Sequence, residues 1–264
     1  MATRGGREGG PMRIPEFLYS IYERRLVREI DQTRIPCHVG IILDGNRRWA
    51  RELGSSASAG HRKGADHVDE VLGWCKEAGI SIVTLWMLST DNLSRSDEEL
   101  NELIGIIADT VENLASSGKW RIRIIGDLDL VPKDAASRLR AAASASAGAE
   151  SMEVNVAVGY GGRHEITDAV RAYLREQAAA GASLEEVAEK LNVSAITEHM
   201  YTSGQPDPDL IIRTSGEQRM SGFMLWQTVH TELYFCEAFW PEFRRTDLLR
   251  ALRDYSARER RMGR

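Results

Sequence analysis

Short apolar runs alternate with longer amphipathic stretches along the chain, from about residue 38 onward. The short runs are four to eight residues long and rich in Val, Ile, Leu and Tyr. This length and composition are typical of buried β-strands. We therefore predict strands at His38–Leu43, Ser81–Leu88, Arg121–Ile125, Glu153–Val158, Asp209–Ile212 and Glu232–Phe235.

Between these runs, apolar residues recur every three or four positions, which is the spacing of amphipathic helices. The clearest helix covers Asp97–Leu114, and Ser96 with Glu99 three residues later predicts a capping box at its start. The other predicted helices are Gly60–Ala78, Pro132–Ala147, Arg163–Gln177, two shorter helices within 178–199, and Asp247–Arg260.

This alternation predicts one α/β domain, with a mostly parallel central sheet flanked by helices on both faces. We find no internal repeat and no linker that would divide the chain. In open α/β sheets, ligands bind beyond the carboxyl ends of the strands. The segments that follow Leu43, Leu88 and Ile212 are therefore the candidate binding segments.

The N-terminal region divides into two parts. Residues 1–12 are rich in Gly and Arg, and we predict a disordered tail there. The domain then spans 13–264, and an amphipathic helix is expected over 13–32. Its basic residues would allow contact with a membrane surface, but packing of its apolar stripe on its own domain is the simpler interpretation. The stripe consists of Phe17, Leu18, Ile21, Tyr22, Leu26 and Ile30.

Composition excludes several classes of protein. The 264 residues carry a formal net charge of −5, which is unlike the basic excess of a nucleic-acid-binding protein. The longest apolar runs are far too short to span a bilayer, and the N-terminus lacks the apolar core of a secretory signal. Three widely spaced cysteines make neither a metal pattern nor a disulfide framework. We therefore expect a cytoplasmic location.

The segment Asp44–Trp49 is the first candidate site. A buried strand ends at Asp44, Gly45 lets a ligand approach the backbone, and a helix is expected to start at once. Free N–H groups at a helix start, together with Arg47 and Arg48, suit a phosphate group. An Asp beside phosphate is a natural Mg²⁺ ligand. The alternative is an ordinary Asp-Gly turn with solvated arginines.

Three further segments carry similar chemistry. His61 lies in the segment Gly60–Gly64, where it could donate to a phosphate leaving group, although a solvated or structural His is the simpler interpretation. The polar segment 89–95 follows a buried strand, and its alternative is a loop with Asx turns. The segment 213–222 combines Arg213 and Arg219 with serines and glycines, and suits a diphosphate clamp. Glu232 is a candidate second carboxylate for a metal.

Several sequence blocks of this chain, which include the candidate segments, occur together in one known family. The blocks are HVGIILDGNRRWA, GHRKGA, LSTDNLSR, VNVAVGYGGR, DLIIRTSGEQR with SGFMLWQ, TELYF and ERRMGR. In this order they resemble the cis-prenyltransferases, the undecaprenyl diphosphate synthase family, from about residue 36 to the C-terminus. The likeness is greatest to the short-chain cis-farnesyl diphosphate synthases.

The resemblance implies an enzyme that condenses isopentenyl diphosphate with an allylic diphosphate, geranyl or farnesyl, in the Z configuration. It implies Mg²⁺ as cofactor, bound by Asp44 and Glu232, and Asp44 and Asn92 as catalytic residues. It also implies a hydrophobic tunnel, and a homodimer through Arg261 and Gly263. The implied substrate-binding residues are Gly45, Asn46, Arg47, Arg48, Trp49, His61, Ser89, Thr90, Asp91, Arg95, Arg213, Arg219, Met220 and Ser221.

The product is expected to be short, such as (2Z,6E)-farnesyl diphosphate. Many long-chain members carry Ala where this chain carries Met87, and a larger side chain there would shorten the tunnel. A long-chain polyprenyl diphosphate synthase is the alternative, and a non-catalytic partner subunit is a further one. A Mg²⁺-dependent phosphatase that uses Asp44 as nucleophile would need a second nearby carboxylate, and position 46 is Asn.

Overall fold

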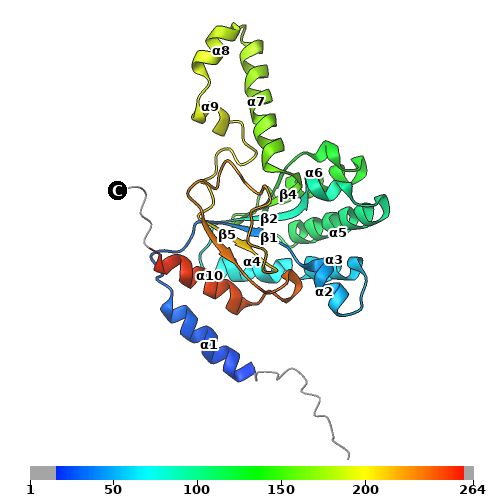
Figure 1. The fold of residues 1–264 in the computed structure, drawn as a ribbon, viewed down its shortest axis with the longest axis vertical. Coiled ribbons are helices and arrows are strands. Elements are labelled where there is room, and N and C mark those ends of the chain that lie inside the picture. Colours follow the sequence, from blue (N-terminus) through cyan, green and yellow to red (C-terminus); the bar gives the residue numbers. More distant parts are fainter. Residues whose placement is uncertain (1–15, 259–264) are drawn as a thin grey trace, which may run out of the picture.

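The computed structural model describes residues 16–258 (Figure 1). The predicted disordered tail, residues 1–12, lies outside the described residues. The same holds for Arg261 and Gly263, which were predicted to reach a second subunit.

Six strands form the central sheet, and each neighbouring pair is parallel, as predicted. The strand order is β3-β4-β2-β1-β5-β6. β1 and β2 occupy the centre, so their buried sequences are apolar on both faces. The strands are β1 His38–Ile42, β2 Ile82–Ser89, β3 Arg121–Ile125, β4 Glu153–Tyr160, β5 Leu210–Arg213 and β6 Glu232–Phe235.

Helices connect the strands and pack on the sheet (Figure 1). In the figure, α7–α9 extend away from the sheet at one end. Three short 3₁₀ helices cover Thr90–Ser94, Leu128–Leu130 and Trp240–Glu242. The α-helices are α1 Glu16–Glu29, α2 Asn46–Glu52, α3 Ala57–Asp66, α4 Val68–Glu77, α5 Asp97–Ser116, α6 Lys133–Ala145, α7 Gly162–Ala179, α8 Leu184–Lys190, α9 Val193–Thr197 and α10 Arg245–Ala257.

Two local predictions need correction. The helix predicted over Gly60–Ala78 is two helices, α3 and α4, that meet at His67. The carbonyl of Gly64, which would bond to the next turn of a continuous helix, accepts the indole N–H of Trp240 at 2.8 Å. At the start of α5, Ser96 accepts the N–H of Glu99 as predicted, but the Glu99 carboxylate turns to Arg95 instead of completing a capping box.

A β-bulge distorts β2 where it reaches the site. Trp86 pairs with Ala157 of β4 and Leu88 pairs with Val158, so Met87 is an extra residue on β2. Gly159, with φ of +60°, is the extra residue that restores the register on β4. Bulges re-aim side chains that regular alternation would place on fixed faces.

Two apolar clusters pack on opposite faces of the sheet. The larger cluster joins the strands to α1, α4, α5, α6 and α10, and Leu85 and Leu88 belong to it. The smaller cluster contains Ile42, Phe223 and Met224. A segment that follows β5 therefore covers part of the second face.

The N-terminal helix α1 packs on α10 with the later part of its apolar stripe. Leu26 is fully buried, and Ile30 is nearly so. The hydroxyls of Tyr19 and Tyr22 accept hydrogen bonds from Arg244, the N-cap of α10, and from Arg250 within α10. Within the described residues, no helix is both long and apolar enough to cross a membrane.

The packing of α1 can be tested by substitution within its apolar stripe. Leu26→Ala should lower the free energy of unfolding by about 2–5 kcal/mol, because it leaves a cavity in the core. Ile21→Ala on the same helix should cost far less, since Ile21 is 44% exposed. Urea denaturation measures both changes, and equal losses would contradict the packing of α1 on the domain.

Candidate active site

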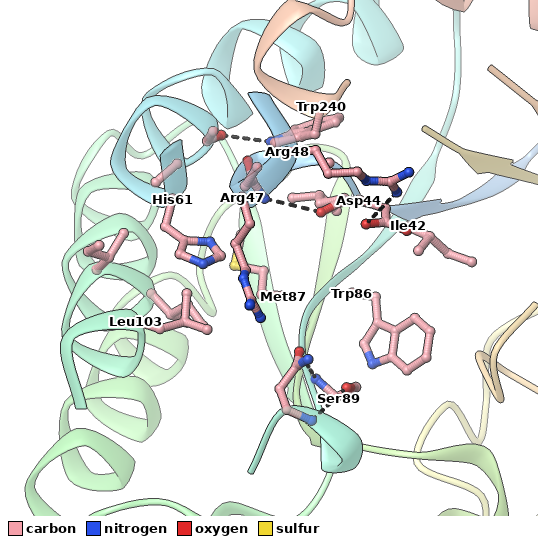
Figure 2. Close-up of a pocket in the computed structure, with 18 of the residues that line it drawn as sticks. Ile42, Asp44, Arg47, Arg48, His61, Trp86, Met87, Ser89, Leu103 and Trp240 are labelled. Atoms are coloured by element: carbon pink, nitrogen blue, oxygen red, sulfur yellow. Dashed lines mark hydrogen bonds and ion pairs between the residues drawn. The ribbon is translucent and has the colours of Figure 1, made fainter. Parts of the chain in front are cut away.

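A cavity of about 440 Å³ lies where β1, β2 and β5 end, bounded by α2, α3 and α5 (Figure 2). Its charged and polar lining residues are mostly exposed or half-buried. Its lining residues on α5, which are Leu103, Ile106, Ile107 and Thr110, are buried. The polar lining residues include Asp44, Arg47, Arg48, Arg51, His61, Ser89, Asp91, Asn92, Arg95, Arg213 and Ser221. The apolar ones include Ile42, Leu43, Val68, Trp86, Met87, Leu103, Ile106, Ile107 and Trp240.

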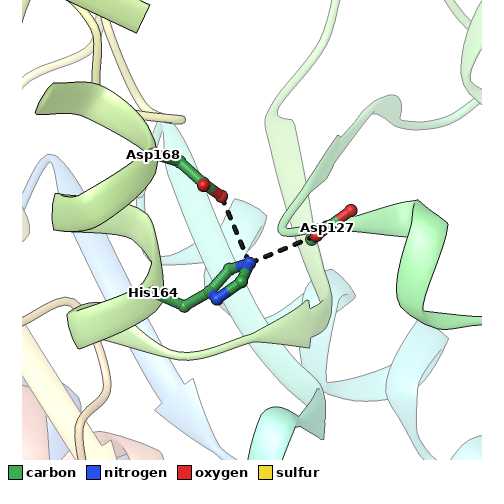
Figure 3. Close-up of side chains that lie close together, drawn as sticks. All are labelled: Asp127, His164 and Asp168. Atoms are coloured by element: carbon green, nitrogen blue, oxygen red, sulfur yellow. Dashed lines mark hydrogen bonds and ion pairs between the residues drawn. The ribbon is translucent and has the colours of Figure 1, made fainter. Parts of the chain in front are cut away.

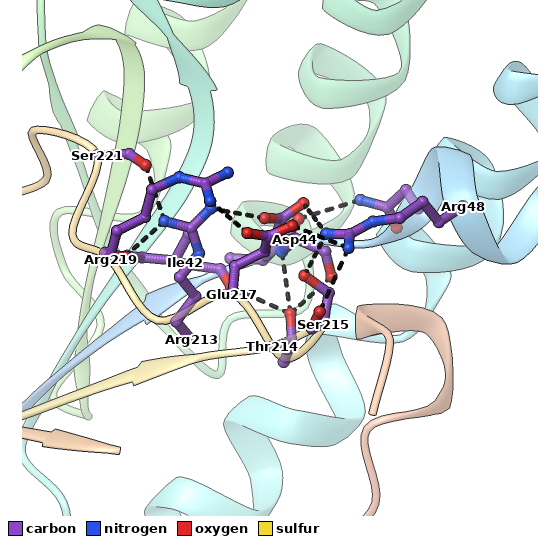
Figure 4. Close-up of polar contacts among 11 residues, drawn as sticks. Ile42, Asp44, Arg48, Arg213, Thr214, Ser215, Glu217, Arg219 and Ser221 are labelled. Carbon is purple, nitrogen blue, oxygen red and sulfur yellow. Dashed lines mark hydrogen bonds and ion pairs between the residues drawn. The ribbon is translucent and has the colours of Figure 1, made fainter. Parts of the chain in front are cut away.

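An ion pair between Asp44 and Arg213 occupies the centre of the polar side (Figure 4). The guanidinium of Arg213 donates to a carboxylate oxygen of Asp44 at 2.8 Å, and Arg48 approaches the other oxygen at 3.5 Å. The Arg213 side chain is 5% exposed and that of Asp44 is 31% exposed. Burial acts to raise the pKa of Asp44, but the hydrogen bond and charge of Arg213 outweigh it, so the pKa is lowered. Asp44 is therefore ionised at neutral pH.

Backbone conformation holds these two residues in place. The Thr214 hydroxyl accepts the N–H of Asp44 and donates to its carbonyl, which locks β1 to the loop after β5. Gly45 has φ of +106°, and a Cβ there would lie 2.7 Å from Phe239. Only glycine therefore fits directly after Asp44.

The loop after β5 adds two more charges, those of Glu217 and Arg219. Glu217 accepts a hydrogen bond from Arg48 at 3.0 Å and pairs with Arg219 on its other oxygen (Figure 4). Arg213 also donates to the hydroxyl of Ser221 at 2.8 Å. Glu217 was not predicted as a site residue, because a carboxylate in a Gly-rich loop has no distinguishing sequence pattern.

The polar opening of the cavity, here called its mouth, has the loop after β5 on one side. On the opposite side, His61 of α3 lies beside Arg95. Arg95 lies 3.4 Å from the Nε2 atom of His61 and donates to Glu99 at 3.2 Å. Glu99 also approaches Arg47 at 3.7 Å, so one carboxylate serves two arginines. Burial, followed by the charge of Arg95, lowers the pKa of His61 to about 4. His61 is therefore neutral at pH 7 in the free protein.

Ser89 and Asn92 form a reciprocal cap at the end of β2. The amide oxygen of Asn92 accepts the N–H of Ser89 at 3.2 Å, and the Ser89 hydroxyl accepts the N–H of Asn92 at 3.1 Å. This pairing fixes the Asn92 side chain beside the cavity. It also leaves the NH₂ group as the part of Asn92 that can serve a ligand.

Not every predicted binding residue lines the cavity. Trp49 donates to Glu242 at 3.0 Å, and Met220 packs against the smaller apolar cluster. Neither Thr90 nor Arg219 belongs to the lining. Thr90 follows the lining residue Ser89, and Arg219 contacts the site through Glu217. Arg51 of α2 does line the cavity and was not predicted.

Within one chain, Glu232 lies away from Asp44, its predicted partner in the metal site. Glu232 opens β6 opposite Leu210, the first residue of β5, whereas Asp44 follows the end of β1. Since all these strands are parallel, Asp44 lies at the carboxyl ends of the strands and Glu232 at their amino ends within one chain. The Glu232 carboxylate pairs instead with Arg258.

A second group of possible metal ligands lies outside the cavity (Figure 3). The Nε2 atom of His164 is 3.1 Å from an oxygen of Asp127 and 3.3 Å from one of Asp168. The carboxylate of Asp168 also accepts from Tyr201 at 2.5 Å and pairs with Arg171. The spacing of His164 and Asp168, one helical turn apart on α7, is the only sequence signal for this cluster.

Comparison with known proteins identifies the family. Residues 42–263 match the Prenyltransf family model, whose description is that of an undecaprenyl diphosphate synthase. This chain belongs to the undecaprenyl diphosphate synthase family. The resemblance found in the sequence blocks is thereby confirmed, and the chain is a prenyltransferase.

Similar proteins cover almost the whole chain. A (2Z,6E)-farnesyl diphosphate synthase of Thermobifida fusca is 56% identical over 96% of this chain and 99% of its own length. A short-chain Z-isoprenyl diphosphate synthase of Mycobacterium leprae is 52% identical over 96% of this chain and 98% of its own length. The crystal structure of lavandulyl diphosphate synthase from Lavandula x intermedia, in complex with dimethylallyl diphosphate, matches with a TM-score of 0.81 at 33% identity. That match covers 88% of this chain and 100% of the lavandulyl enzyme.

The low pKa of His61 gives a direct test of the site geometry. In the free prenyltransferase, the imidazole signals of His61 should titrate near pH 4 in an NMR experiment. Arg95→Gln should raise that pKa, because the Arg95 charge opposes protonation. The unfolded chain binds this proton near pH 6.5. The free energy of unfolding should therefore fall as the pH falls from 6.5 to 4. Titration at the ordinary value in both proteins would contradict the described geometry.

Proposed function

We propose that this prenyltransferase condenses isopentenyl diphosphate with geranyl or farnesyl diphosphate, forms a Z double bond and releases diphosphate. The observation that carries the proposal is one cavity with an arginine-rich mouth around Asp44 and an apolar wall on α5. Such a cavity suits a substrate with an anionic head and a hydrocarbon tail. The names of the similar farnesyl and isoprenyl diphosphate synthases support the same chemistry.

Two diphosphate groups can be placed at the mouth by its charges. Arg47 and Arg48, with Gly45, Asn46 and His61, suit the allylic diphosphate on the α2 side. On the β5 side, Arg213, Arg219 and Ser221 suit isopentenyl diphosphate. In the free protein these arginines pair with Asp44, Glu99 and Glu217. A bound diphosphate would replace those carboxylates as their partner.

When a diphosphate takes the place of Asp44 beside Arg213, the Asp44 carboxylate becomes free to bind Mg²⁺. Mg²⁺ commonly takes one or two carboxylates together with phosphate oxygens and water. Asp44 is ionised, lines the cavity and lies between the two arginine groups, so its carboxylate fits this role. When bound there, Mg²⁺ would stabilise the negative charge that develops on the departing diphosphate.

The remaining residues would orient the reaction. The allylic C–O bond breaks, the new C–C bond forms at the isopentenyl double bond, and one proton leaves the isopentenyl unit. Fixing both head groups holds the reacting carbons together. Asn92 would donate its NH₂ group to a head group and align the isopentenyl unit for proton loss. A diphosphate oxygen is the proton acceptor, since an amide is a poor base.

A short product is proposed from the apolar side of the cavity. Met87 lines the cavity together with Leu103 and Ile107 of α5. A bulky side chain at position 87 limits the space for a growing chain, which favours (2Z,6E)-farnesyl diphosphate. The alternative function, a long-chain polyprenyl diphosphate synthase, would need a tunnel that continues beyond these residues.

The sequence blocks also bear on the assembly and the location of the protein. We propose a homodimer in which Arg261 and Gly263 reach the neighbouring site. We also propose a cytoplasmic enzyme that contacts the inner face of the membrane peripherally. Crosslinking of the purified chain and flotation with anionic vesicles would test these two proposals.

One incubation tests the proposed reaction. The purified protein is mixed with ¹⁴C-isopentenyl diphosphate, Mg²⁺ and either geranyl or farnesyl diphosphate, and the dephosphorylated products are separated by chromatography. A labelled C15 Z,E-product from geranyl diphosphate, lost on addition of a chelator, is expected. Absence of any labelled product with both primers would refute the proposal.

Asp44→Asn should reduce kcat by about 10²–10³-fold, because it removes the carboxylate that would hold the Mg²⁺ acting on the departing diphosphate. The amide oxygen can still accept a hydrogen bond from Arg213, which also keeps its bonds to the Arg219 carbonyl and Ser221, and thermal unfolding shows whether the variant is folded. Steady-state kinetics with geranyl diphosphate measure the loss. Asp66→Asn, at the exposed end of α3, is the matched control and should retain full activity. Equal activity of the two variants would exclude Asp44 from the chemistry.

Met87→Ala should lengthen the product by one or more five-carbon units, because it enlarges the apolar side of the cavity. Product chain length is read by reverse-phase chromatography after dephosphorylation. Met200→Ala removes a buried Met from a remote cluster with Ala169 and Ile196, and should leave the product unchanged. An unaltered product distribution in Met87→Ala would show that Met87 does not limit the chain.

A further inference from the structure

Two consecutive residues of β2, Trp86 and Met87, both line the cavity. Regular strands send successive side chains to opposite faces of a sheet. Here the bulge at Met87 lies at the end of the sheet, where the cavity reaches around both faces. The two side chains therefore approach one cavity from two different sides.

The apolar clusters define these two sides. Met87 packs against the larger cluster, which contains Leu103 and Ile107 of α5. Trp86 packs against the smaller cluster with Ile42 and Phe223. Met87 thus shares its side with the wall proposed for the growing chain.

Trp86 shares its side with the residues proposed to hold isopentenyl diphosphate. Ile42 pairs in register with Trp86 on one neighbouring strand and with Arg213 on the other, so all three side chains leave the same face of the sheet. Ser221, which accepts a hydrogen bond from Arg213, lies two residues before Phe223. Figure 2 shows Trp86 between Ile42 and Ser89 on the cavity wall.

The indole ring of Trp86 is firmly held. It stacks on Phe223 with ring centroids 5.1 Å apart and an interplanar angle of 15°. Its N–H donates to the carbonyl of Tyr160 at 3.3 Å. The hydroxyl of Tyr160 in turn accepts the N–H of Met224, next to Phe223. A ring fixed at both its face and its edge cannot move aside for a larger ligand.

We propose that Trp86 determines the size of the acceptor, by forming a rigid wall against the five-carbon isopentenyl group. This proposal rests on the proposed function. Trp86 limits the acceptor, and Met87 limits the growing chain, so adjacent residues of one bulged strand control two different substrates. An apolar pocket of this kind discriminates one methylene by roughly 10–200-fold.

The test compares isopentenyl diphosphate with its homologue in which an ethyl group replaces the methyl group on the double bond. For each acceptor, kcat/KM is measured with geranyl diphosphate and Mg²⁺. The wild-type chain should reject the ethyl acceptor by at least tenfold. Trp86→Leu should reduce that preference by at least tenfold and raise the KM for isopentenyl diphosphate. It should leave the KM for geranyl diphosphate within about twofold.

Two further variants separate this role from general damage to the fold. Trp86→Phe retains an aromatic ring against Phe223 and should show an intermediate preference. Met87→Ala should change product length while its acceptor preference stays within about twofold of the wild type. Thermal unfolding of each variant shows whether it is folded, and Trp86→Phe carries the test if Trp86→Leu is not.

Two results would overturn the inference. One is an unchanged acceptor preference in the folded Trp86 variants. The other is an equal change of preference in Met87→Ala, which would show that the cavity is not divided between the two residues. A wild-type chain that used neither acceptor would instead refute the proposed function, so the two failures are distinguishable.

Discussion

The ion pair between Asp44 and Arg213 is the constraint on which the site depends. Neighbouring parallel strands, β1 and β5, end side by side, with Ile42 in register with Arg213. The Thr214 hydroxyl then ties the two strand ends together through the backbone of Asp44. A nearly buried guanidinium must keep a partner, because an isolated buried charge is strongly destabilising. In the free protein that partner is Asp44, and in a complex the partner becomes a diphosphate.

The other arginines at the mouth are likewise paired with carboxylates in the free protein. Glu217 engages Arg48 and Arg219, and Glu99 engages Arg95 and Arg47. Each carboxylate holds arginines near the position that a diphosphate would occupy, so little rearrangement is needed when a substrate arrives. Pre-positioned donors of this kind act most strongly where charge develops during a reaction. The apolar walls behind the mouth would then divide the two hydrocarbon groups between the sides of Met87 and Trp86.

Local sequence patterns were sufficient for some features and not for others. The six strands and the ligand-binding edge followed from short apolar runs and from the polar residues after Asp44, Ser89 and Arg213. The break at His67 was missed because Trp240, far away in sequence, takes the carbonyl of Gly64. Strand register places Glu232 at the opposite edge from Asp44, and the sequence blocks alone did not show this. The bulge at Met87 also has no local signal, since it depends on pairing with β4.

A crystal structure of the protein with Mg²⁺, isopentenyl diphosphate and a non-reactive allylic thiodiphosphate would test the central claim most directly. The account predicts both diphosphates at one mouth, one on Arg48 and the other on Arg213 and Ser221, with the Asp44 carboxylate turned to the metal. The isopentenyl group should lie against Trp86 and the allylic chain beside Met87. Diphosphate or metal bound instead at Asp127, His164 and Asp168, with the Asp44–Arg213 pair intact, would contradict it.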